Sequence, residues 1–304
     1  MEVCMVDNNR KSKKYIPGML LIGSLWLTLS TFSWFHHSLD ISASERRKLA
    51  QFPDLSFESL ISGKFMDSFE AYALDQFPHR DDIRTLKAIS AFYLFGQKDN
   101  NGIYITGGYA AKLEYPLNKN SVSNASARFN YLYEKYMKNK KMNIYLSIVP
   151  DKAYFSAKKN GYPSMDYDRL FSLMQKGMPF AKYIDITDCL ELSDYYKTDS
   201  HWRQEKIVDV AQRLAESMCA GDTASDIPGK TEKYTEITTD LPFYGVYYGQ
   251  SALPLKNDII HYLTNDVLDA CTVYNVENSK TGDLYDINKL TGRDPYEIFL
   301  SGAS

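Results

Sequence analysis

The sequence predicts an α/β fold in which helices cover both faces of an open, mainly parallel sheet, with a hydrophobic helix at the N-terminus. Short apolar runs at 103–105, 143–149 and 183–186 have the composition of buried strands. Amphipathic helical patterns separate these runs, as in folds with a parallel sheet. The apolar run at 15–35 predicts the helix that precedes the sheet.

The first element is a predicted membrane segment. Residues 15–35 are long enough and apolar enough to cross a hydrocarbon core as a helix. The segment follows a basic cluster, Arg10, Lys11, Lys13 and Lys14. Because such clusters stay on the cytoplasmic side, we predict a cytoplasmic tail at 1–14, a single-pass signal-anchor at 15–35 in the cell membrane, and an extracytoplasmic remainder. The alternative is a cleaved signal peptide, but 33–37 (SWFHH) lacks a small-x-small cleavage site.

Composition excludes some classes of function. The 304 residues are 44% hydrophobic and 24% charged, as in globular proteins, and the net charge is -3. No basic stripe interleaves with aromatic residues, so we predict no nucleic-acid partner. Cys4 falls in the predicted cytoplasmic tail, and Cys189, Cys219 and Cys271 remain outside. An odd number excludes a complete disulfide framework, and the sequence does not choose a pair.

Residues 36–98 read as a helical lead-in or stalk. Phe65, Phe69, Tyr72 and Ala73 recur at helical spacing. Asp81 and Asp82 suit the first turn of another helix, where the helix dipole favours negative charge.

Residues 99–304 carry the predicted α/β domain. The strand at 103–105 is closed by Gly107 and Gly108, and the strand at 143–149 ends at Pro150. The other expected elements are helices at 121–140, 166–177 and 204–218, and strands at 183–186 and 257–263. Sites in open parallel sheets lie beyond the carboxyl ends of the strands, which points to the loop after residue 186.

That loop contains Asp199-Ser200-His201-Trp202. A carboxylate two residues before an imidazole can fix the tautomer of the ring and stabilise its protonated form, as a general base requires. We therefore predict that Asp199 and His201 form a catalytic dyad. The alternative is a helix N-terminus that Asp199 or Ser200 caps while Trp202 packs.

The run 195–202 (YYKTDSHW) resembles the signature of the DHHW-motif family, which is similar to SGNH hydrolases and to alginate-type O-acetyltransferases. The resemblance extends over about 40–304, through 44–49 (SERRKL), 52–53 (FP), 63–65 (GKF), 75–80 (DQFPHR), 101–104 (NGIY) and 149–152 (VPDK). It implies a three-layer SGNH/flavodoxin-like fold. It also implies that Asp199 orients His201 and that His201 acts as the base. A serine would carry the acyl group to or from a sugar hydroxyl. Ser200 replaces the first histidine of the family motif.

The nucleophile is not assigned. Relatives carry an Asp-Ser turn downstream of a segment like 291–302 (TGRDPYEIFLSG). The resemblance therefore implies that the domain at 99–304 lacks this segment, through truncation or loss. Ser251 is a weak candidate, because it follows a glycine-containing turn without a clear strand-turn-helix frame.

Aromatic residues around the motif suit a sugar ligand, because sugar rings stack on aromatic faces. The expected substrate-binding residues are Tyr195, Tyr196, Trp202, Tyr244, Tyr247 and Tyr248, and the alternative is that each simply packs in the fold. The spacing of the five histidines indicates no metal site, and no cofactor motif is present.

The predicted function is O-acyl (acetyl) transfer or ester hydrolysis on an envelope polysaccharide or exopolysaccharide, at the membrane and alongside acetylation-complex proteins. The alternative is a non-catalytic envelope module that binds glycan or a partner protein with a degenerate or truncated hydrolase fold.

Overall fold

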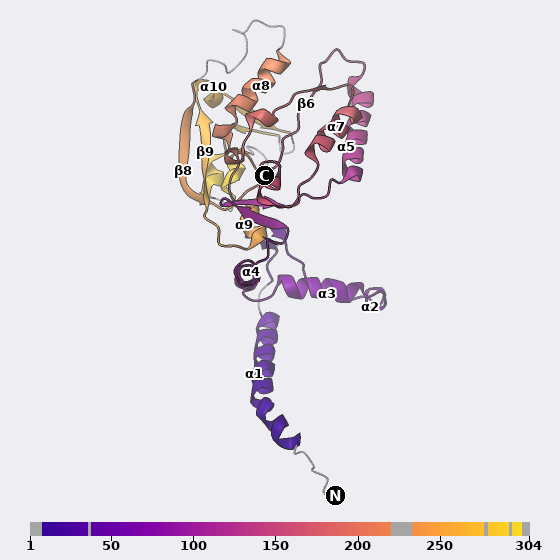
Figure 1. The fold of residues 1–304 in the computed structure, drawn as a ribbon, viewed down its shortest axis with the longest axis vertical. Helices are drawn as coiled ribbons and strands as arrows, with labels where there is room; N and C mark the ends of the chain where they lie inside the picture. Colours follow the sequence, from indigo (N-terminus) through magenta and orange to yellow (C-terminus); the bar gives the residue numbers. More distant parts are fainter. Residues whose placement is uncertain (1–7, 36–37, 220–232, 277–278, 292–293, 300–304) are drawn as a thin grey trace. The chain divides into compact units, whose positions relative to one another are not determined.

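The computed structural model describes residues 8–35, 38–219, 233–276, 279–291 and 294–299 (Figure 1). The chain forms two compact units, Met1–Lys87 and Ala88–Ser304. The sequence predicted a division between the lead-in and the α/β domain at residue 98.

The first unit begins with a long helix, α1 (Asn8–Phe35). The predicted membrane segment at 15–35 lies within it. Among the residues that the structure describes, no helix combines the length and the apolar character needed to cross a membrane. The predicted anchor stays a prediction.

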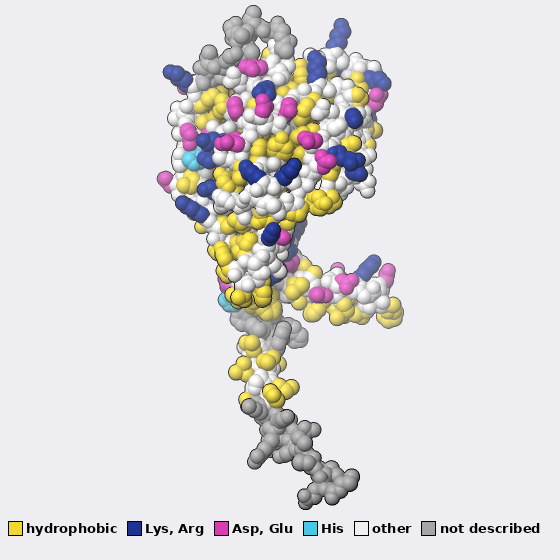
Figure 2. All heavy atoms as spheres, viewed as in Figure 1, with side chains coloured by type: hydrophobic (Ala, Val, Ile, Leu, Met, Phe, Trp, Pro, Cys, Tyr) yellow, Lys and Arg dark blue, Asp and Glu magenta, His cyan; other side chains and the backbone are white. Residues whose placement is uncertain are grey.

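Short elements follow α1. The antiparallel pair β1 (Ile41–Ser42) and β2 (Arg47–Lys48) precedes α2 (Phe57–Ile61), α3 (Lys64–Asp75) and α4 (Arg80–Ile89). The helical spacing predicted for Phe65, Phe69 and Tyr72 is confirmed: their ring centroids lie 6.4, 6.0 and 5.4 Å from that of Phe52. Figure 2 shows hydrophobic side chains along one side of α2 and α3.

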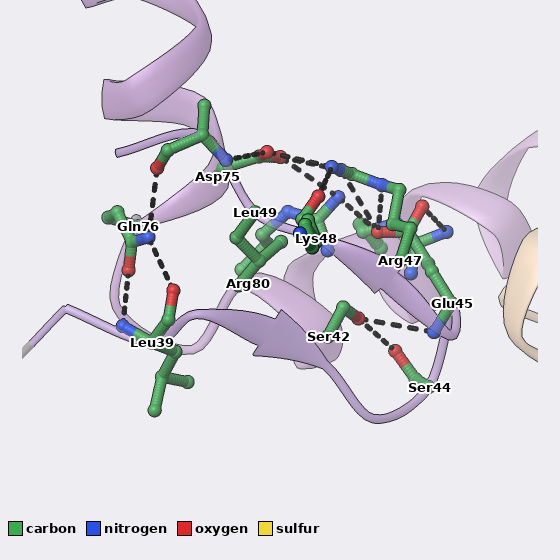
Figure 3. Close-up of polar contacts among 12 residues, drawn as sticks. Leu39, Ser42, Ser44, Glu45, Arg47, Lys48, Leu49, Asp75, Gln76 and Arg80 are labelled. Atoms are coloured by element: carbon green, nitrogen blue, oxygen red, sulfur yellow. Dashed lines mark hydrogen bonds and ion pairs between the residues drawn. The ribbon is translucent and has the colours of Figure 1, made fainter. Parts of the chain in front are cut away.

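Polar side chains hold the strands of the first unit to the end of α3 (Figure 3). Arg47 binds Asp75 through two contacts, Nη1 to Oδ2 at 2.8 Å and Nη2 to Oδ1 at 2.6 Å. The Gln76 amide accepts from Leu39 N at 2.9 Å and donates to Leu39 O at 2.9 Å. Glu45 forms ion pairs with Arg80 at 2.6 Å and Arg84 at 3.0 Å.

The second unit opens with a three-stranded antiparallel sheet, β3 (Asp99–Asn100), β4 (Ile103–Thr106) and β5 (Tyr109–Lys112). Gly107 and Gly108 join β4 to β5 with φ of 54° and 83°. Two consecutive positive φ values define the tight hairpin turn that glycine favours. The predicted strand at 103–105 is therefore confirmed, as part of an antiparallel hairpin.

The helices of the second unit are α5 (Lys119–Leu132), α6 (Lys152–Ser156), α7 (Tyr167–Gly177), α8 (Val208–Met218), α9 (Val246–Ser251) and α10 (Asp266–Asp269). Three of them, α5, α7 and α8, match predicted helices, and the three shorter ones were not predicted. The predicted helix at 121–140 ends in a π-helical turn, Tyr133–Met137. The predicted helix at 204–218 begins with a separate 3₁₀ turn, Gln204–Lys206.

The predicted three-layer, mainly parallel sheet is not what the structure shows. The fold mixes helices with small sheets, and among the described residues the one parallel pair is β6 (Tyr145–Leu146) with β7 (Lys182–Tyr183). The remaining pairs are antiparallel: β8 (Thr235–Phe243) with β9 (Asp258–Thr264), and β10 (Thr272–Asn275) with β11 (Lys280–Asp283).

The difference lies in the strand pairing. The parallel ladder covers only two residues of each apolar run, Tyr145–Leu146 and Lys182–Tyr183, and a 3₁₀ turn at Thr187–Cys189 follows the second run. Residues 235–243, which the sequence pattern did not mark as a strand, supply the partner of β9. The strand predicted at 257–263 is confirmed as β9.

Two buried clusters support the loop that carries the motif. On one side lie Ile184, Ile186, Leu190 and Val210, with Trp202 packed against them. On the other lie Tyr196, Phe243, Ile260 and Ile298. Cys189, Cys219 and Cys271 are free thiols.

Candidate functional site

Asp199 and His201 form a direct pair, as the sequence predicted. His201 Nδ1 lies 2.5 Å from Asp199 Oδ1, and the His201 backbone N–H donates to the same oxygen at 3.1 Å. The Asp199 side chain is only 1% exposed, whereas that of His201 is 52% exposed. The carboxylate is therefore fixed inside the protein, and the imidazole reaches the surface.

The second oxygen of Asp199 is also bonded. Val246 N, in the first residue of α9, donates to Asp199 Oδ2 at 2.8 Å. Gly245 precedes it, and a Cβ atom there would lie 2.3 Å from Asp199 Cβ and 2.4 Å from Thr198 O. No side chain fits at that distance, so the approach of α9 to Asp199 requires glycine at position 245.

A second carboxylate, that of Asp258 at the start of β9, holds the backbone just before the motif. It accepts from Lys197 N at 2.8 Å, from Thr198 N at 2.7 Å and from Thr198 Oγ1 at 2.6 Å. The Thr198 hydroxyl in turn accepts from Gly245 N at 2.9 Å. Because Thr198 is fully buried, these bonds fix the position from which Asp199 projects.

The charge state of Asp199 determines the tautomer of His201. Burial raises the pKa of Asp199, but hydrogen bonds from the His201 ring, Val246 N and His201 N outweigh this effect and lower the pKa to about 2. An ionised carboxylate can only accept, so His201 Nδ1 carries the shared proton. In the neutral form of the ring, Nε2 then carries the lone pair that a general base needs.

The exposed ring of His201 is supported from one side. It stacks on Tyr296, with ring centroids 4.1 Å apart and planes 20° apart. Burial, with smaller effects of Asp199 and Asp294, raises the pKa of Tyr296 to about 12. Tyr296 therefore stays neutral near pH 7 and offers the imidazole an aromatic face.

A buried lysine binds the backbone just before Asp199. Lys152, in α6, is 2% exposed and donates to Tyr196 O at 2.9 Å and Lys197 O at 3.2 Å. Burial lowers its pKa to about 7, although Asp199, Asp258 and Asp151 act in the opposite direction. Its ammonium group also lies 4.9 Å from the ring centre of Tyr247.

The aromatic residues predicted to bind substrate differ in how much of each side chain is exposed to solvent. Tyr195 and Tyr196 are 2% and 0% exposed, and the Tyr195 hydroxyl donates to Pro150 O at 2.5 Å. Trp202 is half-buried against the Ile184 cluster. Tyr244 is 44% exposed and lies beside Tyr248, with ring centroids 4.7 Å apart. Tyr244 therefore presents aromatic surface to solvent, whereas Tyr195 and Tyr196 do not.

Ser251, the weak nucleophile candidate, is fully buried at the end of α9. Its hydroxyl donates to Tyr248 O at 3.0 Å and accepts from Leu253 N at 3.2 Å. No hydrogen bond joins Ser251 to His201 within the part of the chain that the structure describes. The other predicted nucleophile segment includes 292–293 and 300–302, which lie outside the described residues.

The alternative in which Asp199 or Ser200 caps the following helical turn does not match the geometry. That turn begins at Gln204 after Arg203, and no side chain caps it. Asp199 instead binds His201 and the start of α9.

Sequence reasoning missed four residues of the site: Lys152, Gly245, Asp258 and Tyr296. Signals for two of them were present, because Lys152 belongs to the VPDK segment and Gly245 lies in a glycine-bracketed aromatic run. Tyr296 lies in the segment 291–302 that the resemblance named, but its contact with His201 was not predicted, and Asp258 had no local signal, because it reaches the motif through the pairing of β8 with β9.

Comparisons with known proteins give two distant likenesses. The chain is similar to the solved structure of a DHHW family protein from Eubacterium siraeum, with 16% identity, a TM-score of 0.46, and coverage of 68% of this chain and 69% of that chain. It is also similar to PatB1 of Bacillus cereus, with 17% identity, a TM-score of 0.44, and coverage of 59% and 64%. No family model and no curated protein matches. At identities and scores this low, neither likeness bears on the function of the chain.

Proposed function

We propose that this chain is a membrane-anchored envelope protein that transfers an acyl group to, or hydrolyses an acyl ester of, a polysaccharide. The observation that carries the proposal is the pair of Asp199 and His201. A buried, ionised carboxylate holds Nδ1 of a half-exposed imidazole at 2.5 Å. The resemblance of YYKTDSHW to the DHHW signature supports the choice of acyl chemistry.

The proposed reaction uses His201 as the base. Nε2 removes the proton of an attacking hydroxyl group while the hydroxyl oxygen bonds to the acyl carbon, and the imidazolium then returns the proton to the departing alkoxide. Asp199 stabilises the imidazolium between the two steps, because its charge lies next to Nδ1. The attacking hydroxyl belongs to a serine, to water or to the acceptor sugar.

The exposed aromatic surface supports a polysaccharide as the substrate class. Tyr296 lies against the His201 ring, and Tyr244 is 44% exposed beside Tyr248. Aromatic faces stack on sugar rings, and phenol hydroxyls bond sugar hydroxyls. The extracytoplasmic location in the proposal depends on the basic cluster and the apolar run at the N-terminus.

The test is turnover of p-nitrophenyl acetate by the purified full chain in detergent. We expect His201→Ala to lower kcat/KM by at least a hundredfold. The matched control is His79→Ala, because His79 also contacts a carboxylate, Asp82 at 3.2 Å, but both side chains are exposed. The control should match wild type, and equal turnover in His201→Ala and wild type would rule out the proposal.

The second candidate function is a non-catalytic glycan-binding module. It is favoured by one observation: none of the described residues forms a hydrogen bond with His201 Nε2. In this case full-chain protein with no esterase activity would still bind acetylated polysaccharide, and Tyr244→Ala would weaken the binding while His201→Ala would not.

A further inference from the structure

A second group of chemically active side chains lies on the ribbon formed by β8 and β9. Glu205 in the 3₁₀ turn Gln204–Lys206, Glu236 in β8 and His261 in β9 each offer a ligand atom, and these atoms all lie within 4.8 Å of one another. From these contacts we propose that the three residues bind a divalent metal ion of the Zn²⁺ type. This site is separate from the pair of Asp199 and His201.

Strand pairing explains how the three residues meet. In the antiparallel register, Glu236 pairs with Leu263 and Thr238 pairs with His261. Residues two apart in a strand share a face, so Glu236 and His261 are diagonal neighbours on one face of the ribbon. Gln204 fixes the turn that carries Glu205, because its Oε1 accepts from Leu263 N at 2.8 Å.

The buried carboxylate of Glu205 is the observation that points to a ligand. Its side chain is 3% exposed, and neither carboxylate oxygen has a hydrogen-bond partner among the described residues. Arg203 Nη2 lies 2.5 Å from Oε1 and balances charge there, in a geometry that does not form a hydrogen bond. Oε2 likewise accepts no hydrogen bond from any residue that the structure describes. A buried carboxylate oxygen without a donor is costly unless a cation binds it.

The hydroxyl of Tyr196 shows the same deficiency. It is buried without a hydrogen-bond partner, and burial followed by the charge of Glu205 raises the pKa of Tyr196. The phenol keeps its proton, but it forms no hydrogen bond with Glu205 or with any other described residue. A bound cation would compensate the buried carboxylate of Glu205, which accepts no hydrogen bond among the described residues.

The donor set fits the proposed ion. One imidazole nitrogen and two carboxylate oxygens are ligands that Zn²⁺ accepts, and three protein ligands leave a position for water. With Arg203 counted, the two glutamates leave a net charge of -1 around His261. The site is also accessible, because the side chains of Glu236 and His261 are 50% and 20% exposed.

Small movements would complete the coordination. His261 Nδ1 lies 2.7 Å from Glu236 Oε1 and 3.2 Å from Thr238 Oγ1. Ligand atoms around a tetrahedral Zn²⁺ ion are about 3.3 Å apart. The Glu236 oxygen therefore has to move about 0.6 Å away from His261 Nδ1, and the Glu205 oxygen, within 4.8 Å of both, has to approach by up to about 1.5 Å.

The test measures metal binding by the full chain in detergent after chelator treatment and dialysis. Zn²⁺ is titrated, and bound metal is counted by equilibrium dialysis with elemental analysis. We expect Glu236→Gln and His261→Gln each to bind one equivalent fewer than wild type, or to bind it at least tenfold more weakly. Both positions are at the surface of the ribbon, so the variants should fold.

Two control variants test whether Zn²⁺ binding depends on His261 and not on other histidines. His79→Gln should retain wild-type Zn²⁺ binding, because among the described residues His79 and Asp82 belong to no group of three possible ligands. His201→Gln should also retain it, so the result is independent of the proposed acyl chemistry. Stabilisation gives a second readout: Zn²⁺ should raise the melting temperature of wild type but not of His261→Gln. Equal Zn²⁺ binding by wild type, Glu236→Gln and His261→Gln, or no binding by wild type, would overturn the proposal.

Discussion

At the scale of single residues, the site depends on the close approach of Gly245 to Asp199. The backbone of Gly245 has a φ of -73°, which any residue can adopt, so space rather than conformation requires glycine. An added Cβ atom would lie 2.3 Å from Asp199 Cβ. The start of α9 would have to move away from Asp199, and the bond from Val246 N to Oδ2 would be lost.

Gly245→Ala should therefore destabilise the second unit by about 1–3 kcal/mol, the usual cost of overpacking a buried position. Chemical denaturation of the full chain measures the change. The control is Gly23→Ala, because an added Cβ atom there meets nothing within 4 Å. Unchanged stability in Gly245→Ala would show that α9 does not pack on Asp199 as described.

The sequence predicted the Asp199 and His201 pair, but it did not predict most of the residues around the pair. A carboxylate two residues before a histidine sufficed to place Asp199 next to His201, because a loop of this length brings the two side chains together. Of the residues expected to bind substrate, Tyr195 and Tyr196 have buried rings, which matches the alternative that they pack in the fold. Tyrosines give the same sequence signal whether they face a ligand or fill a core.

At the scale of elements, the first unit depends on the contact between β2 and the end of α3. Asp75 accepts from Arg47 twice and from Ala50 N at 2.9 Å. The hydrogen bonds from Arg47, which outweigh the opposing effect of burial, lower the pKa of Asp75 to about 2 from its ordinary value of 3.8. A lowered carboxyl pKa contributes stability above pH 4, and this contribution is lost as the pH falls toward 2.

Asp75→Asn should remove this acid sensitivity. We expect a loss of about 1 kcal/mol at pH 7, because solvent partly screens the pair, and a smaller difference from wild type near pH 2. Hydrogen exchange of peptides that contain Ala50 and Gln76 measures the local effect. The control is Glu134→Gln, whose exposed pair with Lys138 contributes little. Equal exchange at pH 7 in Asp75→Asn and wild type would contradict the expectation.

Secondary structure was predictable where local signals were strong. Asp166 caps α7 by accepting from Arg169 N, and the helix ends at Gly177 as the pattern indicated. Residues 235–243 gave no such signal, because Asp240 and Pro242 are unusual in a strand. Pairing with β9 overrides that weak local preference. The direction of the pairing, and therefore the sheet type, could not be predicted from strand composition.

At the scale of the whole molecule, the site combines segments that are distant in sequence. The loop at 194–203 supplies the dyad, α6 supplies Lys152, the start of α9 supplies Gly245, and residues 294–299 supply Tyr296. Local patterns identify the dyad alone, because the other contacts form only when the chain has folded. The resemblance to DHHW proteins therefore remains an expectation about function, and the geometry around Asp199 is what supports the proposed chemistry.

The most direct test of the account is the effect of Asp199→Asn on turnover of p-nitrophenyl acetate by the full chain. Asparagine preserves the shape of the side chain but removes the charge that fixes the His201 tautomer. We predict that kcat falls at least tenfold and that KM changes little. Wild-type kcat in Asp199→Asn, or a loss no larger than that of His79→Ala, would contradict a role for the Asp199 and His201 pair as a working base.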